Sequence, residues 1–217
     1  MPKRKKSGIM TDIVLIDIIN FSSLTSTQQL EIITFVTKSY KKMIDKMLHD
    51  SNMSLEKLVL GFVPTGDGFY CILHPRLKGF GSILGLSFNH FSEHISKKYP
   101  YFEGIRIAVH NGDVNEFIDI LGHKNFIGTG LNDCSRFLEL KCFTISTVMV
   151  SDTAYEALKF FLQKHKDFDR LLAQREFKHS NYYHFHDKHG NEKQGRLIWL
   201  RKSGIMNPPN INFNSMI

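Results

Sequence analysis

The fold of this chain is decided by one short stretch, Leu15–Ser22, which reads Leu-Ile-Asp-Ile-Ile-Asn-Phe-Ser. It ends a run rich in isoleucine and valine that begins at Thr11, and this composition predicts a central β-strand. Asp17 interrupts the run, and a buried aspartate is costly unless it is paired, hydrogen-bonded or bound to a metal ion. If a helix follows, its first N–H groups can face an anion. On this stretch alone, an aspartate that merely caps the turn remains the simpler interpretation.

A second aspartate lies in a predicted hairpin. Two short apolar runs, Leu58–Phe62 and Phe69–Leu73, are joined by Val-Pro-Thr-Gly-Asp-Gly, in which Asp67 stands between two glycines. Proline and glycine at these positions predict a tight turn that exposes the carboxylate at its tip. Because such turns are common, Asp67 indicates a site only if it meets Asp17.

A third candidate element is the segment Gly128–Arg136, which reads Gly-Thr-Gly-Leu-Asn-Asp-Cys-Ser-Arg. If it opens a helix, Asn132 and Arg136 are four residues apart and share one face. An amide beside a guanidinium suits a ribose or a phosphate that carries developing negative charge. A surface helix with an ordinary arginine explains the same residues equally well when they are considered alone.

The rest of the sequence alternates between strand-like and helix-like patterns. Amphipathic helices are predicted from Thr25 or Ser26 to about Met47, over Ile83–Ile95, from about Gly130 to Leu140, and from an N-cap at Ser151 or Asp152 to about Leu162. Further strands are predicted over Gly104–His110, Val114–Leu121, Thr144–Val150, Tyr182–Phe185 and Gly195–Leu200, the first two paired across a turn at Asn111–Asp113. Long helices and short strand-to-strand turns together predict an α+β fold, in which helices cover one face of a mostly antiparallel sheet.

Composition and charge limit the class of protein. The 217 residues, 42% hydrophobic, suit one domain over residues 10–205, with a basic mobile tail at 1–9 and a C-terminal tail at 206–217. No apolar run is long enough to span a membrane and no signal peptide is evident, so we expect a cytoplasmic protein. Three cysteines without C-x-x-C spacing argue against disulfides and zinc. The net charge of +7 favours anionic partners, but no basic stripe carries interleaved aromatic residues, so nucleic acid is not expected.

Taken together and in this order, these elements resemble the class III nucleotidyl cyclases, the family of adenylyl and guanylyl cyclases. Asp17 and the residues after it resemble the family's first metal motif, and Thr65–Gly68 resembles its second. The stretch Gly104–Val114 resembles the strand with the family's His-x-Gly-x-Val motif, and Gly128–Arg136 resembles its Asn-x-x-x-Arg helix. The similarity extends from about residue 11 to 160 and implies a ferredoxin-like α+β catalytic domain.

The resemblance also implies a reaction, in which the ribose 3′-oxygen attacks the α-phosphorus, closes a 3′,5′-cyclic monophosphate and releases pyrophosphate. Two divalent ions per site, Mg²⁺ or Mn²⁺, would be held by Asp17, Asp67 and the Ile18 carbonyl. The N–H groups near Asn20, Phe21 and Ser22 would hold the β- and γ-phosphates.

The remaining roles fall on a second subunit, because the family's site lies between two domains and this chain has one. A homodimer with two shared sites is therefore implied. From the partner, Asn132 would orient the ribose and Arg136 would stabilise charge at the α-phosphate. The family also places a lysine on its C-terminal hairpin for the triphosphate, and here both Lys188 and Lys193 qualify.

Two departures from the family concern the base. Members that act on ATP carry a lysine four residues before the hairpin aspartate and an aspartate seven before the catalytic asparagine, where this chain has Val63 and Asn125. Valine cannot hydrogen-bond a base, whereas an asparagine amide both donates and accepts. The glutamate and cysteine often seen in guanylyl enzymes are also missing. The base pocket is therefore either loose or built for a different base.

A small cyclase without purine-reading residues resembles the bacterial pyrimidine cyclases of Pycsar antiphage defence, which make cyclic UMP or cyclic CMP for a separate effector protein. UTP, or else CTP, is the substrate that this resemblance implies. Three alternatives stay open: an adenylyl cyclase with an atypical base pocket, a catalytically silent cyclase-like binding module, and a basic nucleic-acid-binding protein.

Overall fold

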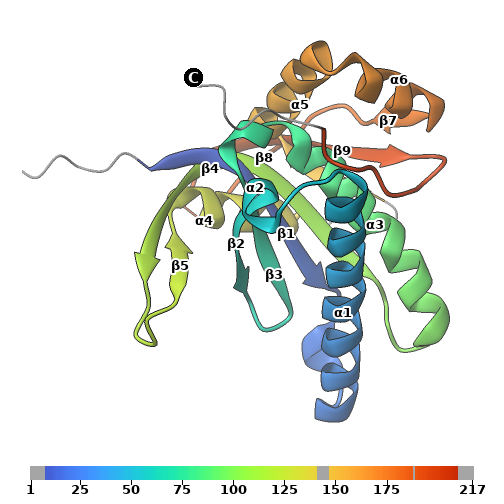
Figure 1. Cartoon of the computed structure of the whole chain (residues 1–217). Helices are drawn as coiled ribbons and strands as arrows, with labels where there is room; N and C mark the ends of the chain where they lie inside the picture. Colours follow the sequence, from blue (N-terminus) through green and yellow to red (C-terminus); the bar gives the residue numbers. More distant parts are fainter. Residues whose placement is uncertain (1–7, 141–146, 188, 210–217) are drawn as a thin grey trace, which may run out of the picture.

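The computed structural model describes residues 8–140, 147–187 and 189–209 (Figure 1). These residues form a sheet with the strand order β2-β3-β1-β4-β6-β9-β7, in which β5 pairs with β4 and β8 pairs with β9. The strands are β1 (Ile9–Ile18), β2 (Val59–Pro64), β3 (Gly68–Leu73), β4 (Ile105–Ile118), β5 (Lys124–Ile127), β6 (Val148–Ser151), β7 (Phe177–His179), β8 (Tyr183–His186) and β9 (Glu192–Leu200). Among the described pairs, only β4 and β6 run parallel, so the sheet is mixed but mostly antiparallel.

The helices confirm the predicted α+β fold. They are α1 (Ser26–Asp50), α2 (Leu55–Leu58), α3 (Phe80–Lys98), α4 (Thr129–Arg136), α5 (Asp152–Lys164) and α6 (Lys166–Gln174), with 3₁₀ turns η1 (Phe21–Ser23), η2 (Pro75–Leu77) and η3 (Phe137–Glu139). The long helices α1, α3 and α5 pack in one cluster against one face of the sheet. The short helix α4 and turn η3 pack against the other face, whereas the prediction placed all the helices on one face.

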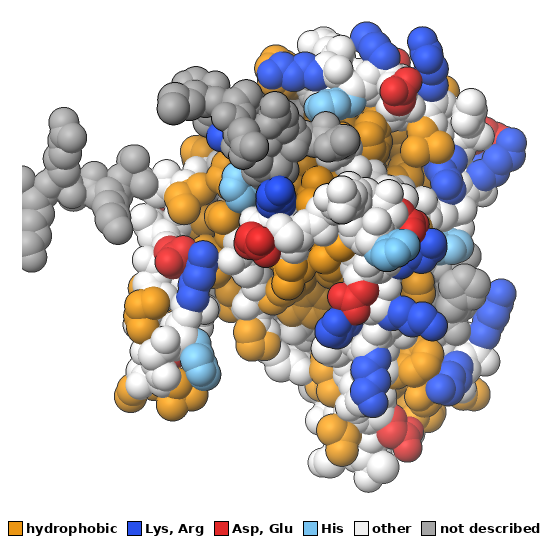
Figure 2. Space-filling view, viewed as in Figure 1, with side chains coloured by type: hydrophobic (Ala, Val, Ile, Leu, Met, Phe, Trp, Pro, Cys, Tyr) orange, Lys and Arg blue, Asp and Glu red, His pale blue; other side chains and the backbone are white. Residues whose placement is uncertain are grey.

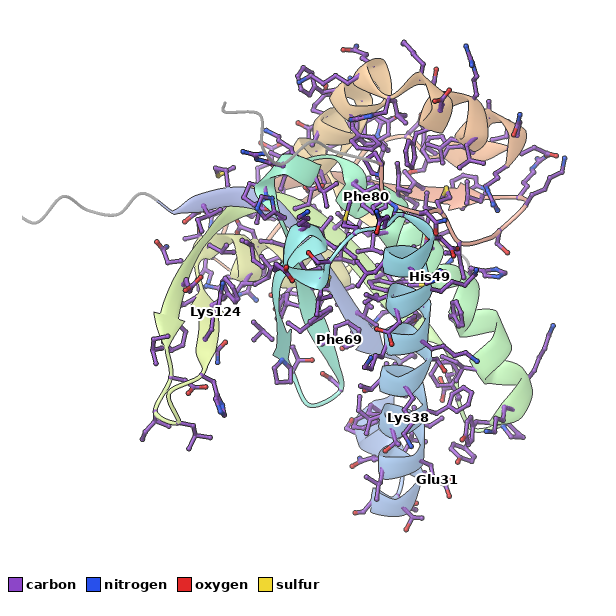
Figure 3. The ribbon with its side chains drawn as sticks, viewed as in Figure 1. Glu31, Lys38, His49, Phe69, Phe80 and Lys124 are labelled. Atoms are coloured by element: carbon purple, nitrogen blue, oxygen red, sulfur yellow. The ribbon has the colours of Figure 1, made fainter. Side chains whose placement is uncertain are left out.

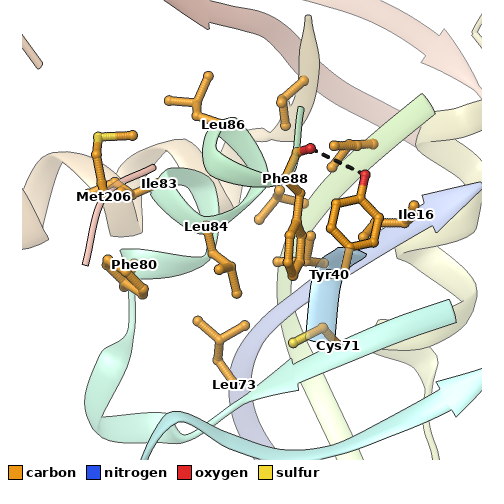
Figure 4. Close-up of a cluster of buried hydrophobic side chains, with 14 of the residues drawn as sticks. Ile16, Tyr40, Cys71, Leu73, Phe80, Ile83, Leu84, Leu86, Phe88 and Met206 are labelled. Carbon is orange, nitrogen blue, oxygen red and sulfur yellow. Dashed lines mark hydrogen bonds between the residues drawn. The ribbon is translucent and has the colours of Figure 1, made fainter. Parts of the chain in front are cut away.

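The central strand β1 divides the core into two layers because its side chains alternate between the faces of the sheet. Val14 and Ile16 point into the layer with the long helices, whereas Ile13 and Leu15 point into the layer with α4. All four are buried. Figure 4 shows part of the helix-side layer, where the Tyr40 hydroxyl donates a hydrogen bond of 3.2 Å to the Phe88 carbonyl.

A buried carboxylate on β1 ties three elements together. Asp12 is 1% exposed and accepts hydrogen bonds from the N–H groups of Gly79 (2.6 Å) and Gly81 (2.9 Å) at the start of α3. It also accepts one of 2.7 Å from the Asn111 side chain on β4. Burial raises the pKa of Asp12, and these donors oppose that rise. The sequence analysis did not identify this anchor.

Several local predictions are confirmed and one is wrong. Thr25 caps α1 with a capping box to Gln28, as the predicted start at Thr25 or Ser26 requires. Ser151 caps α5, and the predicted strands Tyr182–Phe185 and Gly195–Leu200 correspond to β8 and β9, which pair with each other. The predicted turn at Asn111–Asp113 does not exist, because β4 runs on through these residues and pairs with β1 from Ile105 to Val114. Part of the predicted strand Thr144–Val150 lies outside the described residues, as does Lys188.

The sequence patterns missed helices α2 and α6 and strands β5 and β7, all short. The chain after β9 packs against the domain, since Met206 is buried and its N–H bonds to the Ser87 hydroxyl at 3.0 Å. The boundaries at residues 9 and 205 stay predictions. Across the part of the chain that the structure describes, no helix is both long and apolar enough to cross a membrane.

Candidate active site

The two predicted metal aspartates meet at one cleft. Asp17 is at the end of β1, directly opposite Gly68 on β3, and the N–H of Ile18 donates a hydrogen bond of 2.9 Å to the carbonyl of Asp67. Both carboxylates line a cleft of about 320 Å³. The condition set for Asp67, that it should meet Asp17, is therefore fulfilled.

Two glycines make this meeting possible, each for a different reason. Gly66 has a φ of 95°, a left-handed conformation that favours glycine in the tight turn. At Gly68, an added Cβ would lie 1.9 Å from the carbonyl oxygen of Ile16, so only glycine lets β3 approach β1 here. The Thr65 hydroxyl donates a hydrogen bond of 3.1 Å to the Asp67 carboxylate and helps to orient it.

Arg106 lines the same cleft, and the sequence analysis did not identify it as a candidate site residue. It lies opposite Asp17 in the β1–β4 register, and its Nε donates to Asp17 Oδ2 at 2.8 Å while Nη2 donates to the same oxygen. Its Nη1 donates to the Leu138 carbonyl in η3 at 3.2 Å. Arg106 thus joins a predicted metal ligand to the segment that follows α4. An arginine between two isoleucines of a strand was the available signal, but only the register identifies its partner.

The electrostatics of Asp17 suit a cation. Burial raises the pKa of Asp17, while Arg106 opposes the rise and the nearby charge of Asp67 adds to it. A carboxylate whose charge is destabilised by burial gains from a bound cation. In the part of the chain described, no three His, Cys, Asp or Glu side chains form a metal group. Two carboxylates nevertheless fit Mg²⁺ or Mn²⁺, because such ions commonly take one or two carboxylates together with substrate phosphates.

The predicted phosphate-binding residues follow directly after β1. Asn20 has a left-handed backbone with φ 54°, and the 3₁₀ turn η1 begins at Phe21. The Asn20 side chain donates to Glu103 at 2.6 Å, and Ser22 is exposed. The helix expected immediately after Asp17 is thus a single 3₁₀ turn, and the long helix α1 starts only at Ser26.

Helix α4 carries the predicted catalytic pair, Asn132 and Arg136, on the face of the sheet opposite the long helices. Asn132 is exposed, and Arg136 is 17% exposed with Nη1 at 2.6 Å from Glu139 Oε1. Among the described residues, the cleft of Asp17 and Asp67 is lined by Ser135, Leu138 and Glu139 of this segment but by neither Asn132 nor Arg136. Arg136 nevertheless lies next to the cleft through its ion pair with Glu139, whereas Asn132 points to solvent.

Of the two candidate lysines, the structure places Lys193 beside helix α4. Its ammonium group lies 2.7 Å from the carboxylate of Asp133, the residue after Asn132, and its side chain is 18% exposed. Lys188 lies outside the described residues. The neighbouring Asp187 accepts hydrogen bonds from the side chain of Asn191 and from the N–H groups of Asn191 and His189, which lower the pKa of Asp187 to about 2.

The two residues expected at the base lie on strands that contact each other. Val63 is on β2 and Asn125 on β5, and Phe126 beside Asn125 packs with Val63 in one apolar cluster. The approach is tight, since a Cβ at Gly61 would lie 2.6 Å from the Phe126 ring. The side-chain oxygen Oδ1 of Asn125 accepts a hydrogen bond of 2.8 Å from the N–H of Phe126, so part of the hydrogen-bonding capacity of the amide is used locally.

The residues of the His-x-Gly-x-Val stretch stabilise the packing of β4 against α5. His110 Nδ1 lies 2.9 Å from the hydroxyl of Ser151, the residue that caps α5, and burial lowers the pKa of His110 to about 4. Gly112 is needed because an added Cβ would lie 2.7 Å from the His110 ring. These residues hold β4 against the start of α5 and do not line the cleft.

The overall fold is that of nucleotidyl cyclase catalytic domains. No protein-family model and no curated protein matches the chain. Among solved structures, the catalytic core of a rhodopsin–guanylyl cyclase with converted specificity, in complex with ATPαS, matches with a TM-score of 0.57 at 16% identity, over 93% of this chain and all of that one. The guanylyl cyclase Cya2 matches with 0.55 at 14% identity, over 95% and 98%. The guanylate cyclase domain of RhGC from Catenaria anguillulae, in complex with GTP, matches with 0.53 at 18% identity, over 91% and 100%.

Proposed function

We propose that this protein is a nucleotidyl cyclase that converts a nucleoside triphosphate into its 3′,5′-cyclic monophosphate and pyrophosphate. The observation that carries the proposal is the cleft in which Asp17 and Asp67 meet beside Arg106. The cyclase fold supports it. The intact set of Asp17, Asp67, Asn132 and Arg136 argues against a silent binding module.

The chain's own groups suit this reaction. Asp17 and Asp67, with the Ile18 carbonyl, would hold two divalent ions, which when bound lower the pKa of the attacking hydroxyl and neutralise the leaving phosphates. Arg106 lies beside these carboxylates, and a guanidinium there pairs well with phosphate oxygens. The N–H groups of the turn at Asn20–Ser22 are close to the end of β1, where the β- and γ-phosphates would lie.

The proposed active form is a homodimer with two shared sites. Neither Asn132 nor Arg136 is among the described residues that line the cleft of Asp17 and Asp67, which supports a site completed by these two residues of a second copy. Arg136 would then exchange Glu139 for the α-phosphate of the partner's nucleotide, and Lys193 beside it would contact the triphosphate.

An exposed apolar arm supports this dimer. The hairpin of β4 and β5 projects from the body of the domain, and Figure 2 shows apolar side chains gathered at its tip. Its exposed apolar residues are Phe117, Ile118, Ile120, Leu121 and Ile127, and Ile120 is fully exposed. Lys124 on the same arm, labelled in Figure 3, pairs with Glu116 at 2.7 Å. Apolar residues clustered this densely on a surface mark an interaction site.

We propose UTP, with CTP as the second choice, as the substrate. Val63 offers the base only apolar contact, and Asn125 offers an amide that both donates and accepts. The usual lysine and aspartate for adenine are absent from these positions. The role that follows is production of cyclic UMP or cyclic CMP in the cytoplasm, as an antiphage alarm read by a separate effector protein.

Substrate competition tests the base assignment. Purified protein is incubated with equimolar ATP, GTP, CTP and UTP and with Mn²⁺, and the cyclic products are quantified by mass spectrometry. We expect cyclic UMP or cyclic CMP to dominate. If cyclic AMP formed much faster than either, the chain would be an adenylyl cyclase with an atypical base pocket, and the antiphage role would lose its support.

A further inference from the structure

A second hollow lies on the other side of the hairpin that carries Asp67. It has a volume of about 500 Å³ and is lined by α1 and by the β2–β3 hairpin. Figure 2 shows a recess with apolar side chains between these elements. Phe62, Pro64 and Phe69 face it, whereas Val63 and Asp67 face the opposite side of the hairpin, as the alternation of strand side chains requires. The recess is therefore separate from the metal cleft and shares one wall with it.

The wall of this recess is almost entirely apolar and partly aromatic. The rings of Phe62 and Phe69 lie 5.9 Å apart at 70°, and Phe69 lies 5.9 Å from Tyr40 at 74°. Figure 3 shows Phe69 between the hairpin and α1. The Tyr40 hydroxyl is already bonded to the Phe88 carbonyl, so Tyr40 presents only its ring. Phe62 remains 39% exposed, which leaves an aromatic surface that a ligand can cover.

Charge and size define the class of ligand. The charged residues at the recess, Lys41 and Asp45, pair with each other at 2.5 Å and cancel, so the wall offers no net charge to an ionic ligand. Its volume is within the range of small-molecule pockets, roughly 300–1,000 Å³. We propose that this recess is a regulatory site for an uncharged small molecule that is mainly aromatic or alicyclic.

The regulatory part of the proposal rests on the proposed function. Gly66 and Gly68 are in the wall of the recess and flank Asp67. An added Cβ at Gly66 would meet no atom within 4 Å, so no other described part of the chain covers the tip of the hairpin on that side. A ligand that covers Phe62 and also contacts α1 would hold the hairpin against the helix, and Asp67 would be held in place relative to Asp17. We therefore expect the ligand to strengthen metal binding.

The test uses N-phenyl-1-naphthylamine, an uncharged aromatic fluorophore, with the full chain. We expect saturable fluorescence enhancement. Thr37, an exposed residue of α1 in the wall, is changed to tryptophan, and the matched control is Thr34→Trp, an exposed threonine of the same helix outside the wall. Thr37→Trp should weaken probe binding at least roughly tenfold because the indole fills the recess. Thr34→Trp should bind as the unmodified protein does.

The coupling is measured separately, by electron paramagnetic resonance of free Mn²⁺ without nucleotide. A saturating probe should tighten Mn²⁺ binding by about fivefold, and Thr37→Trp should remove this effect. Absence of saturable binding, or equal binding by Thr37→Trp, would overturn the site. Probe binding without any change in Mn²⁺ affinity would overturn its regulatory role. A protein that binds the probe but cyclises no nucleotide would refute the proposed function and leave the site standing.

Discussion

Replacing Arg106 with methionine should change metal binding and turnover in opposite directions. Methionine keeps much of the apolar stem of arginine but removes the guanidinium. In the protein, that guanidinium donates through Nε and Nη2 to a single oxygen of Asp17, whose side chain is 13% exposed. A divalent ion that binds this oxygen must either displace the arginine or share the oxygen with it, so the ion pair competes with the metal.

The size of the effect follows from the contacts. Hydrogen bonds to charged groups contribute roughly 1.5–3 kcal/mol when well buried. Arg106 is 36% exposed, so solvent screening reduces the value to about 1–1.5 kcal/mol. Removing this competition should therefore strengthen Mn²⁺ binding by about tenfold. Turnover should nevertheless fall, since the guanidinium freed by the metal would no longer be present to pair with the triphosphate.

Mn²⁺ affinity is measured by electron paramagnetic resonance at pH 8 without nucleotide, and turnover is measured separately. Alkaline conditions matter because burial raises the pKa of Asp17, and protons would otherwise compete with the metal. Arg170→Met on α6 is the matched control, since Arg170 is an exposed arginine that pairs only loosely with Asp167 at 3.5 Å. Unchanged or weaker Mn²⁺ binding by Arg106→Met, with normal folding, would refute the competition.

Three further predictions test the rest of the structure. Asp12→Ala should lower the free energy of unfolding by about 3 kcal/mol because it leaves buried N–H donors unpaired. Asp12→Asn should lower it by less. Because the pKa of Asp12 is raised in the folded protein, the contribution of this carboxyl to stability declines as pH rises above the unfolded value of 3.8, so Asp12→Asn should also flatten the pH dependence of the free energy of unfolding in urea titrations compared at pH 4 and pH 8. Mixing inactive Asp67→Ala and Arg136→Ala subunits should restore about one quarter of wild-type activity, since half the dimers would be mixed and each would keep one intact shared site; no recovery after verified subunit exchange would argue against shared sites. Lys193→Ala should raise KM for the triphosphate by about tenfold in steady-state assays; an unchanged KM, with a raised KM in Lys188→Ala, would assign the contact to the other lysine.

The parts of the fold that sequence predicted well are those specified by neighbouring residues. The apolar run before Asp17 predicted β1, and the glycines around Asp67 predicted the hairpin, because strand burial and turn geometry are local properties. The prediction of a turn at Asn111–Asp113 also relied on neighbouring residues alone, and it was wrong. Asn-Gly-Asp is a favourable turn sequence, but here Asn111 is buried and bonds to Asp12 inside a continuous strand. Tertiary pairing overrides the local preference.

The missed residues depend on contacts between distant parts of the chain. Arg106 and Asp17 are 89 residues apart, and only the register of β1 with β4 places them opposite each other. Asp12 likewise meets the start of α3, 67 residues away. Periodicity can show that each residue lies on a strand, but it does not give the register that decides which charges become neighbours.

The central claim is tested most directly by following the reaction of UTP with the purified protein and Mn²⁺. Cyclic nucleotide and pyrophosphate are quantified together by mass spectrometry and phosphorus NMR, with Asp67→Ala as the control. The proposed function predicts equal amounts of cyclic UMP and pyrophosphate, and loss of both products in Asp67→Ala. No cyclic product from UTP, CTP, ATP or GTP, or the same product yield from Asp67→Ala, would contradict a cyclase that works through the Asp17–Asp67 cleft.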